Sequence, residues 1–134
     1  MTFAAKMMLY SAAASAMLAA SPVLLTAEPV KLEFSSVAAD SGKAADLWGD
    51  VLPNVVMQGE DAPSVFVADA GEGLEVSVLY ASNQCSLSDC PVRAFRGGEK
   101  VADEMGCINL AEYTVAESRT AMAACGEVFI FKAK

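Results

Sequence analysis

Four cysteines, Cys85, Cys90, Cys107 and Cys125, lie in the second half of a chain of 134 residues. An even number of cysteines in a short exported chain is typical of a disulfide framework, and four cysteines allow three pairings. Cys85 ends one apolar run and Cys90 begins the next, with the short turn-like segment 86–89 between them. If these two runs form a hairpin, the two sulfurs face each other across its mouth. This spacing favours the pairs Cys85–Cys90 and Cys107–Cys125.

Metal and redox chemistry fit the same cysteines less well. The chain has no Cys-x-x-Cys motif, which a thioredoxin-like centre uses. A four-cysteine zinc site matches the count, but the spacings are not those of a zinc ribbon, and an oxidising compartment competes for the thiols. We therefore interpret the cysteines as structural and predict neither a metal nor a cofactor.

Residues 1–27 have the layout of a secretory signal peptide. One lysine near the start is followed by no charged residue until Glu28, and the stretch between is rich in Ala, Met, Leu and Ser. A retained membrane anchor is the alternative, since about 20 residues span a bilayer, but Pro22 and the Ala and Ser content disfavour it. We predict cleavage after Ala27, leaving a single periplasmic or secreted domain, residues 28–134, without a stable membrane span.

The predicted mature domain is strongly acidic. It keeps 8 basic and 17 acidic residues, which is a net charge of −9. Because like charges repel, neither nucleic acid nor an anionic membrane surface is an expected partner. A cationic protein is a compatible partner, and the alternative is that the charge serves solubility alone.

Alternating apolar residues between turn residues predict a mainly β domain. Residues 30–35 alternate without exception, and the runs 64–70 and 74–82 form a predicted hairpin around the tight turn Gly71-Glu72-Gly73. Further runs begin at Pro91, at Cys107 and at Thr120. Six to seven short strands at this spacing favour a small antiparallel β-sandwich or barrel, stapled by two disulfides.

One short helix is predicted near residues 43–51. Four apolar residues recur there at helical spacing: Ala44, Leu47, Trp48 and Val51. Asp40 or Ser41 can cap its first turn, and Pro53 is expected to end it. A strand over 47–57 is the competing interpretation. We expect Trp48 to be a core residue and not a ligand platform.

The C-terminal third carries three irregular features. The apolar phase switches between Leu110 and Tyr113, which predicts a bulge or a bend. Gly126, next to Cys125, is expected to mark a bulge or a close backbone approach. The segment 128–131 is apolar on both faces, which predicts a central strand buried on two sides.

The chain offers little catalytic chemistry. It contains no histidine, which excludes Ser-His and Cys-His nucleophiles and the usual ligands of zinc hydrolases. Phosphate-binding glycine motifs are absent as well. Three groups of carboxylates remain: Glu60-Asp61, Glu72 with Glu75, and Asp103-Glu104. A small domain rarely builds the deep cleft that a catalytic carboxylate pair needs, and no calcium-loop pattern is present, so we interpret these acids as solvated.

Arg93, Arg96 and Lys100 form a small basic cluster in this acidic chain. One interpretation is a local contact with an anion or a partner. The favoured one is a solvent-exposed face of the strand that follows Cys90, because alternation places Arg93 opposite Val92.

These features predict an exported, non-catalytic binding or interaction module of the cell envelope. An acidic inhibitor of a cationic enzyme such as a lysozyme is one alternative, since opposite charge speeds capture. A structural component of a surface assembly, pairing through strand edges, is another. An enzyme that uses carboxylates only is the third.

Overall fold

The computed structural model of the chain describes residues 28–57 and 62–133. The predicted signal segment and the pair Glu60-Asp61 lie outside them. The described part contains a five-stranded sheet, in the order β2-β3-β4-β5-β6, and a four-stranded sheet, in the order β1-β7-β8-β9, and every strand pair is antiparallel. The elements are β1 (Val30–Lys31), β2 (Ser35–Val37), α2 (Gly42–Trp48), α3 (Leu52–Met57), β3 (Ser64–Gly71), β4 (Leu74–Tyr80), β5 (Asp89–Arg96), β6 (Glu99–Cys107), the 3₁₀ helix η1 (Leu110–Glu112), β7 (Tyr113–Val115), β8 (Ala121–Ala124) and β9 (Glu127–Ile130).

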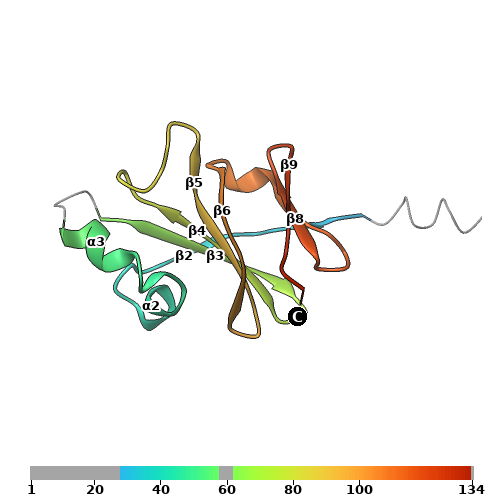
Figure 1. Cartoon of the computed structure of the whole chain (residues 1–134), viewed down its shortest axis with the longest axis horizontal. Helices are drawn as coiled ribbons and strands as arrows, with labels where there is room; N and C mark the ends of the chain where they lie inside the picture. The colour runs from blue at the N-terminus through green and yellow to red at the C-terminus, as the bar shows by residue number, and fades with distance from the viewer. Residues whose placement is uncertain (1–27, 58–61, 134) are drawn as a thin grey trace, which may run out of the picture.

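Three layers follow from this arrangement, with the helices on one side of the five-stranded sheet and the smaller sheet on the other (Figure 1). The core between the two sheets includes Val76, Val78, Tyr113 and Met122. The core between the helices and the five-stranded sheet includes Leu47, Trp48, Val65 and Leu79. Strand β4 is therefore buried on both faces. The predicted mainly β, antiparallel fold with two disulfides is confirmed.

The alternating run at 30–35 is shared between the two sheets. Val30 pairs with Val115 of β7, whereas Ser35 pairs with Val67 of β3, so the chain crosses from one sheet to the other at the buried Leu32. On the opposite side of the molecule, the amide of Lys132 donates to the carbonyl of Val101 at 2.9 Å. The sheets are thus joined along both sides, and the fold lies between a sandwich and a barrel.

The predicted helix forms as α2, and Ser41 caps it by accepting a hydrogen bond from the amide of Ala44 at 3.1 Å. Trp48 is a core residue with 1% exposure, as expected. The predicted role of Pro53 is wrong. This residue lies in the first turn of a second helix, α3, where its missing N–H is not needed. The competing strand does not form.

The predicted central strand at 128–131 is wrong, because β9 is the edge strand of the smaller sheet. Phe129 pairs with Met122 on the core side, while Val128 and Ile130 point outward and are 63% and 73% exposed. Both helices pack on the other sheet, so this outer face stays uncovered at these positions. Cys125 and Gly126, both with positive φ, form the tight turn between β8 and β9 in place of a bulge.

Both favoured disulfide pairings are confirmed, and the η1 helix supplies the predicted bend. Cys85–Cys90 closes the connection between β4 and β5. Cys107–Cys125 joins the end of β6 to the β8–β9 turn, and so links the two sheets.

We predict that the Cys107–Cys125 bridge stabilises the fold more than the Cys85–Cys90 bridge. Their sequence separations are 18 and 5 residues. In the chain-entropy description these separations correspond to roughly 3 and 2 kcal/mol of restricted unfolded-state freedom. Urea unfolding of the two double Cys→Ser variants measures the difference. Equal or inverted losses would contradict this account.

A buried hydrogen-bond relay fixes the helical layer on the sheet. The indole Nε1 of Trp48 donates to the hydroxyl of Ser77 at 2.8 Å, and that hydroxyl donates to the carbonyl of Phe66 at 2.8 Å. Trp48 and Ser77 are both fully buried. The serine therefore serves a donor that would otherwise have no acceptor inside the core.

The variant Ser77→Ala is expected to lower the free energy of unfolding by about 1–3 kcal/mol, because it strands the indole N–H in the core. Ser64→Ala, at an exposed position of β3, is the control and should change it by less than about 0.5 kcal/mol. Urea titrations followed by tryptophan fluorescence measure both. A neutral Ser77→Ala would show that the relay carries no net stabilisation.

Candidate functional site

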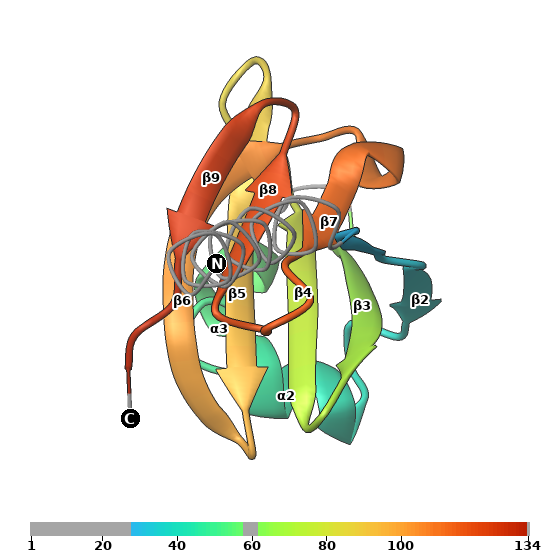
Figure 2. The same cartoon turned by 90° about the vertical axis from the view of Figure 1, so that its right-hand side faces the viewer.

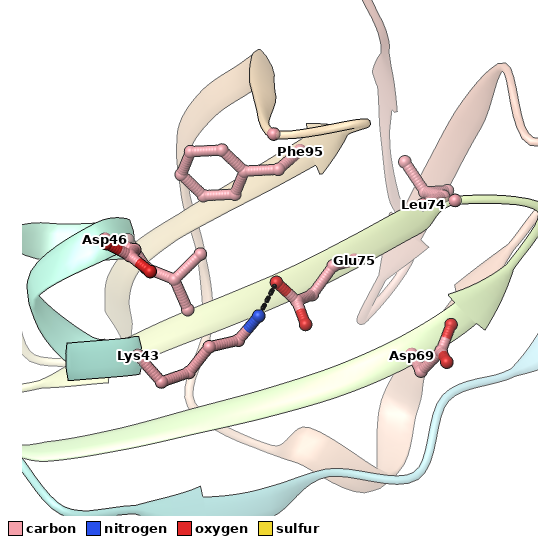
Figure 3. Close-up of a pocket in the computed structure, with 9 residues that line it drawn as sticks. Lys43, Asp46, Asp69, Leu74, Glu75 and Phe95 are labelled. Atoms are coloured by element: carbon pink, nitrogen blue, oxygen red, sulfur yellow. Dashed lines mark hydrogen bonds and ion pairs between the residues drawn. The ribbon is translucent and has the colours of Figure 1, made fainter. Parts of the chain in front are cut away.

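A pocket of about 540 Å³ lies between α2 and the hairpin ends of the five-stranded sheet (Figure 3). Four charged side chains line it: Lys43, Asp46, Asp69 and Glu75. Leu47 of α2 and Phe95 of β5 contribute apolar wall. With three carboxylates and one ammonium group, this lining carries a net charge of −2 when all four groups are ionised.

Two of these carboxylates oppose each other across the sheet. Asp69 of β3 and Glu75 of β4 are direct cross-strand partners, an arrangement that like charges disfavour. Lys43 relieves it from the helical layer, since its Nζ lies 2.6 Å from Oε1 of Glu75 (Figure 3). Asp69 uses Oδ1 to accept the amide of Gly71 at 2.8 Å. The polar half of the pocket therefore already holds one ammonium group.

The singled-out acids that lie within the described residues do not meet as one site. Glu72 is 68% exposed and faces Arg119 at 3.5 Å, whereas the side chain of Glu75 is 26% exposed and belongs to the pocket. Asp103 pairs with Lys100 at 2.9 Å. Of the singled-out acids that the structure describes, only Glu75 lines the pocket.

Sequence reasoning missed Asp46 and Asp69 as pocket residues. The predicted turn at residues 71–73 places Asp69 opposite Glu75. In the structure Gly71 pairs with Leu74, and a register shift between Asp69 and Gly71 brings Asp69 opposite Glu75. Asp46 and Lys43 lie on α2, and no sequence pattern indicated where that helix docks.

The predicted solvent face around Arg93 is wrong, because α2 covers that side of β5. Arg93 is 6% exposed, and its guanidinium lies 4.4 Å from the ring centroid of Trp48. Nη1 and Nη2 donate to the two carboxylate oxygens of Asp50 at 2.7 and 2.8 Å, and Nη1 also donates to the carbonyl of Leu47 at 2.9 Å. This arginine joins the end of α2 to the sheet.

Of the other two members of the basic cluster, Arg96 has a separate partner, whereas Lys100 shares a carboxylate with Arg93. Arg96 donates to the carbonyl of Arg119, in the loop before β8. Lys100 and Arg93 both face Asp103, the latter through Nε at 3.4 Å from Oδ1. Arg93 and Lys100 therefore share one carboxylate, and Arg96 donates to a backbone carbonyl, so each of the three cations already has an acceptor within the chain.

The ion pairs around Arg93 change the acidity of their carboxylates. The hydrogen bond from Arg93 lowers the pKa of Asp50 by more than its slight burial raises it. Burial opposes ionisation of Asp103, but the hydrogen bond from Lys100 and the charge of Arg93 prevail and lower its pKa. Both carboxylates therefore stabilise the folded state when they are ionised.

Because these folded-state pKa values lie below the unfolded ones, their stabilisation is complete above about pH 4 and is lost as the pH falls through them. Asp50→Asn should lower the free energy of unfolding by about 1–2 kcal/mol at pH 7, the low end for charged hydrogen bonds because Asp50 is 63% exposed. The difference in free energy of unfolding between this variant and wild type should become smaller as the pH falls below about 4. Urea titrations across pH 2–7, with Asp46→Asn as control, measure it. A difference that does not vary with pH would contradict this assignment.

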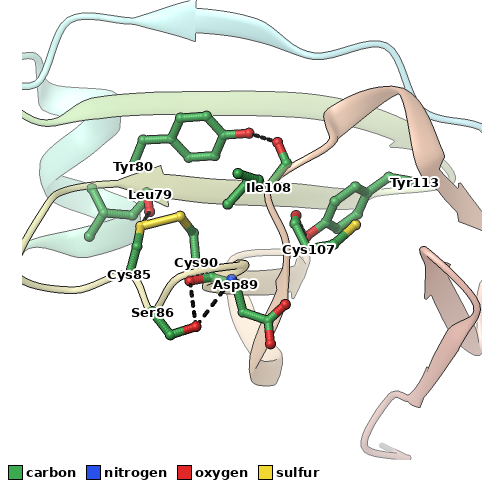
Figure 4. The surroundings of a disulfide bond; sticks show 9 residues. All are labelled: Leu79, Tyr80, Cys85, Ser86, Asp89, Cys90, Cys107, Ile108 and Tyr113. Atoms are coloured by element: carbon green, nitrogen blue, oxygen red, sulfur yellow. Dashed lines mark hydrogen bonds between the residues drawn. A yellow bond between two sulfur atoms is a disulfide. The ribbon is translucent and has the colours of Figure 1, made fainter.

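The opposite end of the five-stranded sheet carries a second, more apolar hollow of about 370 Å³ beside the Cys85–Cys90 bridge (Figure 4). Tyr80, Ala81 and Ile108 line it together with the disulfide. The hydroxyl of Tyr80 donates to the carbonyl of Ile108. Sequence reasoning treated this connection as a turn only.

The described residues contain no three or more His, Cys, Asp or Glu side chains placed so that they could hold a metal ion together, and their four cysteines are all in disulfides. No helix among them is long and apolar enough to cross a membrane. Comparisons with protein-family models, with curated proteins and with solved structures found no match for this chain.

Proposed function

We propose that this chain is an exported, non-catalytic binding module of the cell envelope, and that its acidic pocket receives a cationic group of a protein partner. The signal-like segment 1–27 supports export, and two disulfides are consistent with an oxidising compartment. The cross-strand pair Asp69 and Glu75 carries the proposal. Together with Asp46, it leaves the pocket with negative charge that Lys43 only partly neutralises.

The pocket suits a lysine or arginine side chain. An incoming ammonium or guanidinium group can take the position of the Lys43 ammonium against Glu75, while its methylene stem packs along Leu47 and Phe95. Lys43 is 45% exposed, so it can swing into solvent at little cost. The resident lysine is then a competitor of the ligand, and its removal should strengthen binding.

The inhibitor of a cationic enzyme, such as a lysozyme, is the specific version of this proposal. The excess of 17 acidic over 9 basic residues in the full chain favours fast capture of a basic protein at low salt. The assembly alternative has its own support, since Val128 and Ile130 leave an edge strand with an exposed apolar face.

Calorimetric titration with an oligolysine peptide tests the pocket. The double variant Asp69→Asn/Glu75→Gln should weaken binding by at least about tenfold, while Lys43→Gln should strengthen it severalfold, because it removes the competing ammonium. The matched control Glu104→Gln/Glu117→Gln removes two exposed charges elsewhere and should change affinity by less than about threefold. Equal losses in the two double variants would show non-specific attraction and overturn the pocket.

A c-type lysozyme tests the inhibitor version in the same series. Inhibition of cell-wall lysis that weakens with salt and with the pocket variant would support it. Unimpaired lysis at excess protein and low salt would rule it out and leave the oligolysine result standing.

A further inference from the structure

The connection between β4 and β5 presents an apolar side chain fully to solvent. Leu87 lies in the loop closed by Cys85–Cys90, and its exposure of 103% is the highest among the large apolar residues that the structure describes. This loop projects beyond the ends of the strands (Figure 2). Burying a leucine is worth about 1.5–3 kcal/mol, so leaving one exposed at a tip gives up that stabilisation in the free protein.

Several bonds hold this loop in one conformation. The amide of Ser86 donates to the carbonyl of Asp89 at 2.7 Å, and the amide of Asp89 donates to the hydroxyl of Ser86 at 3.1 Å (Figure 4). The amide of Ile108 donates to the carbonyl of Ser88 at 3.2 Å, which ties the loop to the end of β6. Leu87 and Ser88 thus lie between two hydrogen-bonded residues, and ordering this loop on binding costs little entropy.

A second apolar side chain lies beside this tip. Ile108 is 47% exposed and is joined to the loop through its amide, while its carbonyl is held by Tyr80. The Leu87 tip, meaning Leu87 with Ile108, lies at the end of the five-stranded sheet away from the turns at Gly73 and Gly98, which border the acidic pocket. A partner at this end is therefore not the ligand of that pocket.

We propose that the Leu87 tip is a docking element that inserts into an apolar recess on a protein with a basic rim. A convex, rigid tip is complementary in shape to a concave recess on a folded protein. Asp89 lies two residues after the leucine, and the chain is acidic overall, so the complementary recess is one bordered by positive charge. The same charges repel an anionic bilayer.

Site-specific photo-crosslinking in the producing cells identifies what covers the tip. p-Benzoylphenylalanine replaces Leu87 in the full chain, and Val128, an exposed apolar residue of β9, is the matched control position. The proposal expects a protein adduct from position 87 that is absent from position 128. A lipid adduct, an adduct between two copies of this chain, the same adduct from both positions, or none at either, would each overturn it.

Variants then distinguish specific docking from non-specific apolar association. The probe is the crosslinked protein in purified form, and its affinity for each variant is measured. Leu87→Asp should weaken its binding at least tenfold, equivalent to about 1.4 kcal/mol, whereas Val128→Asp should change it by less than twofold. Cys85→Ser/Cys90→Ser keeps the leucine but frees the loop, and should also weaken binding, because the tip must then be ordered on contact. Urea unfolding is the control for folding: Leu87→Asp should have the same free energy of unfolding as wild type within about 0.5 kcal/mol, because the site is fully exposed.

Two binding measurements distinguish failure of the docking proposal from failure of the acidic-pocket proposal. The pocket variant Asp69→Asn/Glu75→Gln should bind the crosslinked protein like wild type, and Leu87→Asp should bind oligolysine like wild type. Loss of both interactions in either variant would show a general defect and would overturn the assignment of a separate docking end.

Discussion

The contact of Arg93 with Trp48 and Asp50 is the interaction on which the three-layer arrangement depends. The guanidinium lies over the indole and donates hydrogen bonds to both carboxylate oxygens of Asp50. One residue of the sheet therefore contacts both the C-terminal end of α2 and the turn after it. The indole is anchored in turn by Ser77, on the neighbouring strand. These bonds are directional, unlike apolar packing, and they define how the helix sits on the sheet.

The position of α2 decides the character of the acidic pocket. Asp69, Glu75 and Phe95 lie in register across β3, β4 and β5, and would form an ordinary exposed row without the helix. Docking of α2 brings Lys43 and Asp46 over this row and converts it into a walled pocket. A cationic ligand would find opposed carboxylates whose repulsion it can relieve, which is a physical reason for the proposed preference.

The two ends of the five-stranded sheet differ in chemical character. One carries ionisable groups around a hollow, and the other carries a braced apolar tip beside a disulfide. The two disulfides also differ in their structural effect. Cys107–Cys125 links the sheets and closes a long loop, whereas Cys85–Cys90 closes a short one and mainly shapes the tip.

Local pattern in the sequence predicted the β class, the hairpin of β3 and β4, a cap at Asp40 or Ser41, the burial of Trp48 and the favoured disulfide pairing. Each of these follows from residue spacing over short range, where strand and helix periods favour one of the alternatives. The place of the hairpin turn could be read from Gly71-Glu72-Gly73, although the register shift between Asp69 and Gly71 could not. The docking of the helices could not, because it depends on contacts between residues more than 25 positions apart, such as Trp48 with Ser77. For that reason tertiary structure alone decided that Arg93 is buried and that Val128 and Ile130 lie on an open edge. An apolar strand segment looks the same in sequence whether or not another layer covers its second face, and here the helices cover the other sheet.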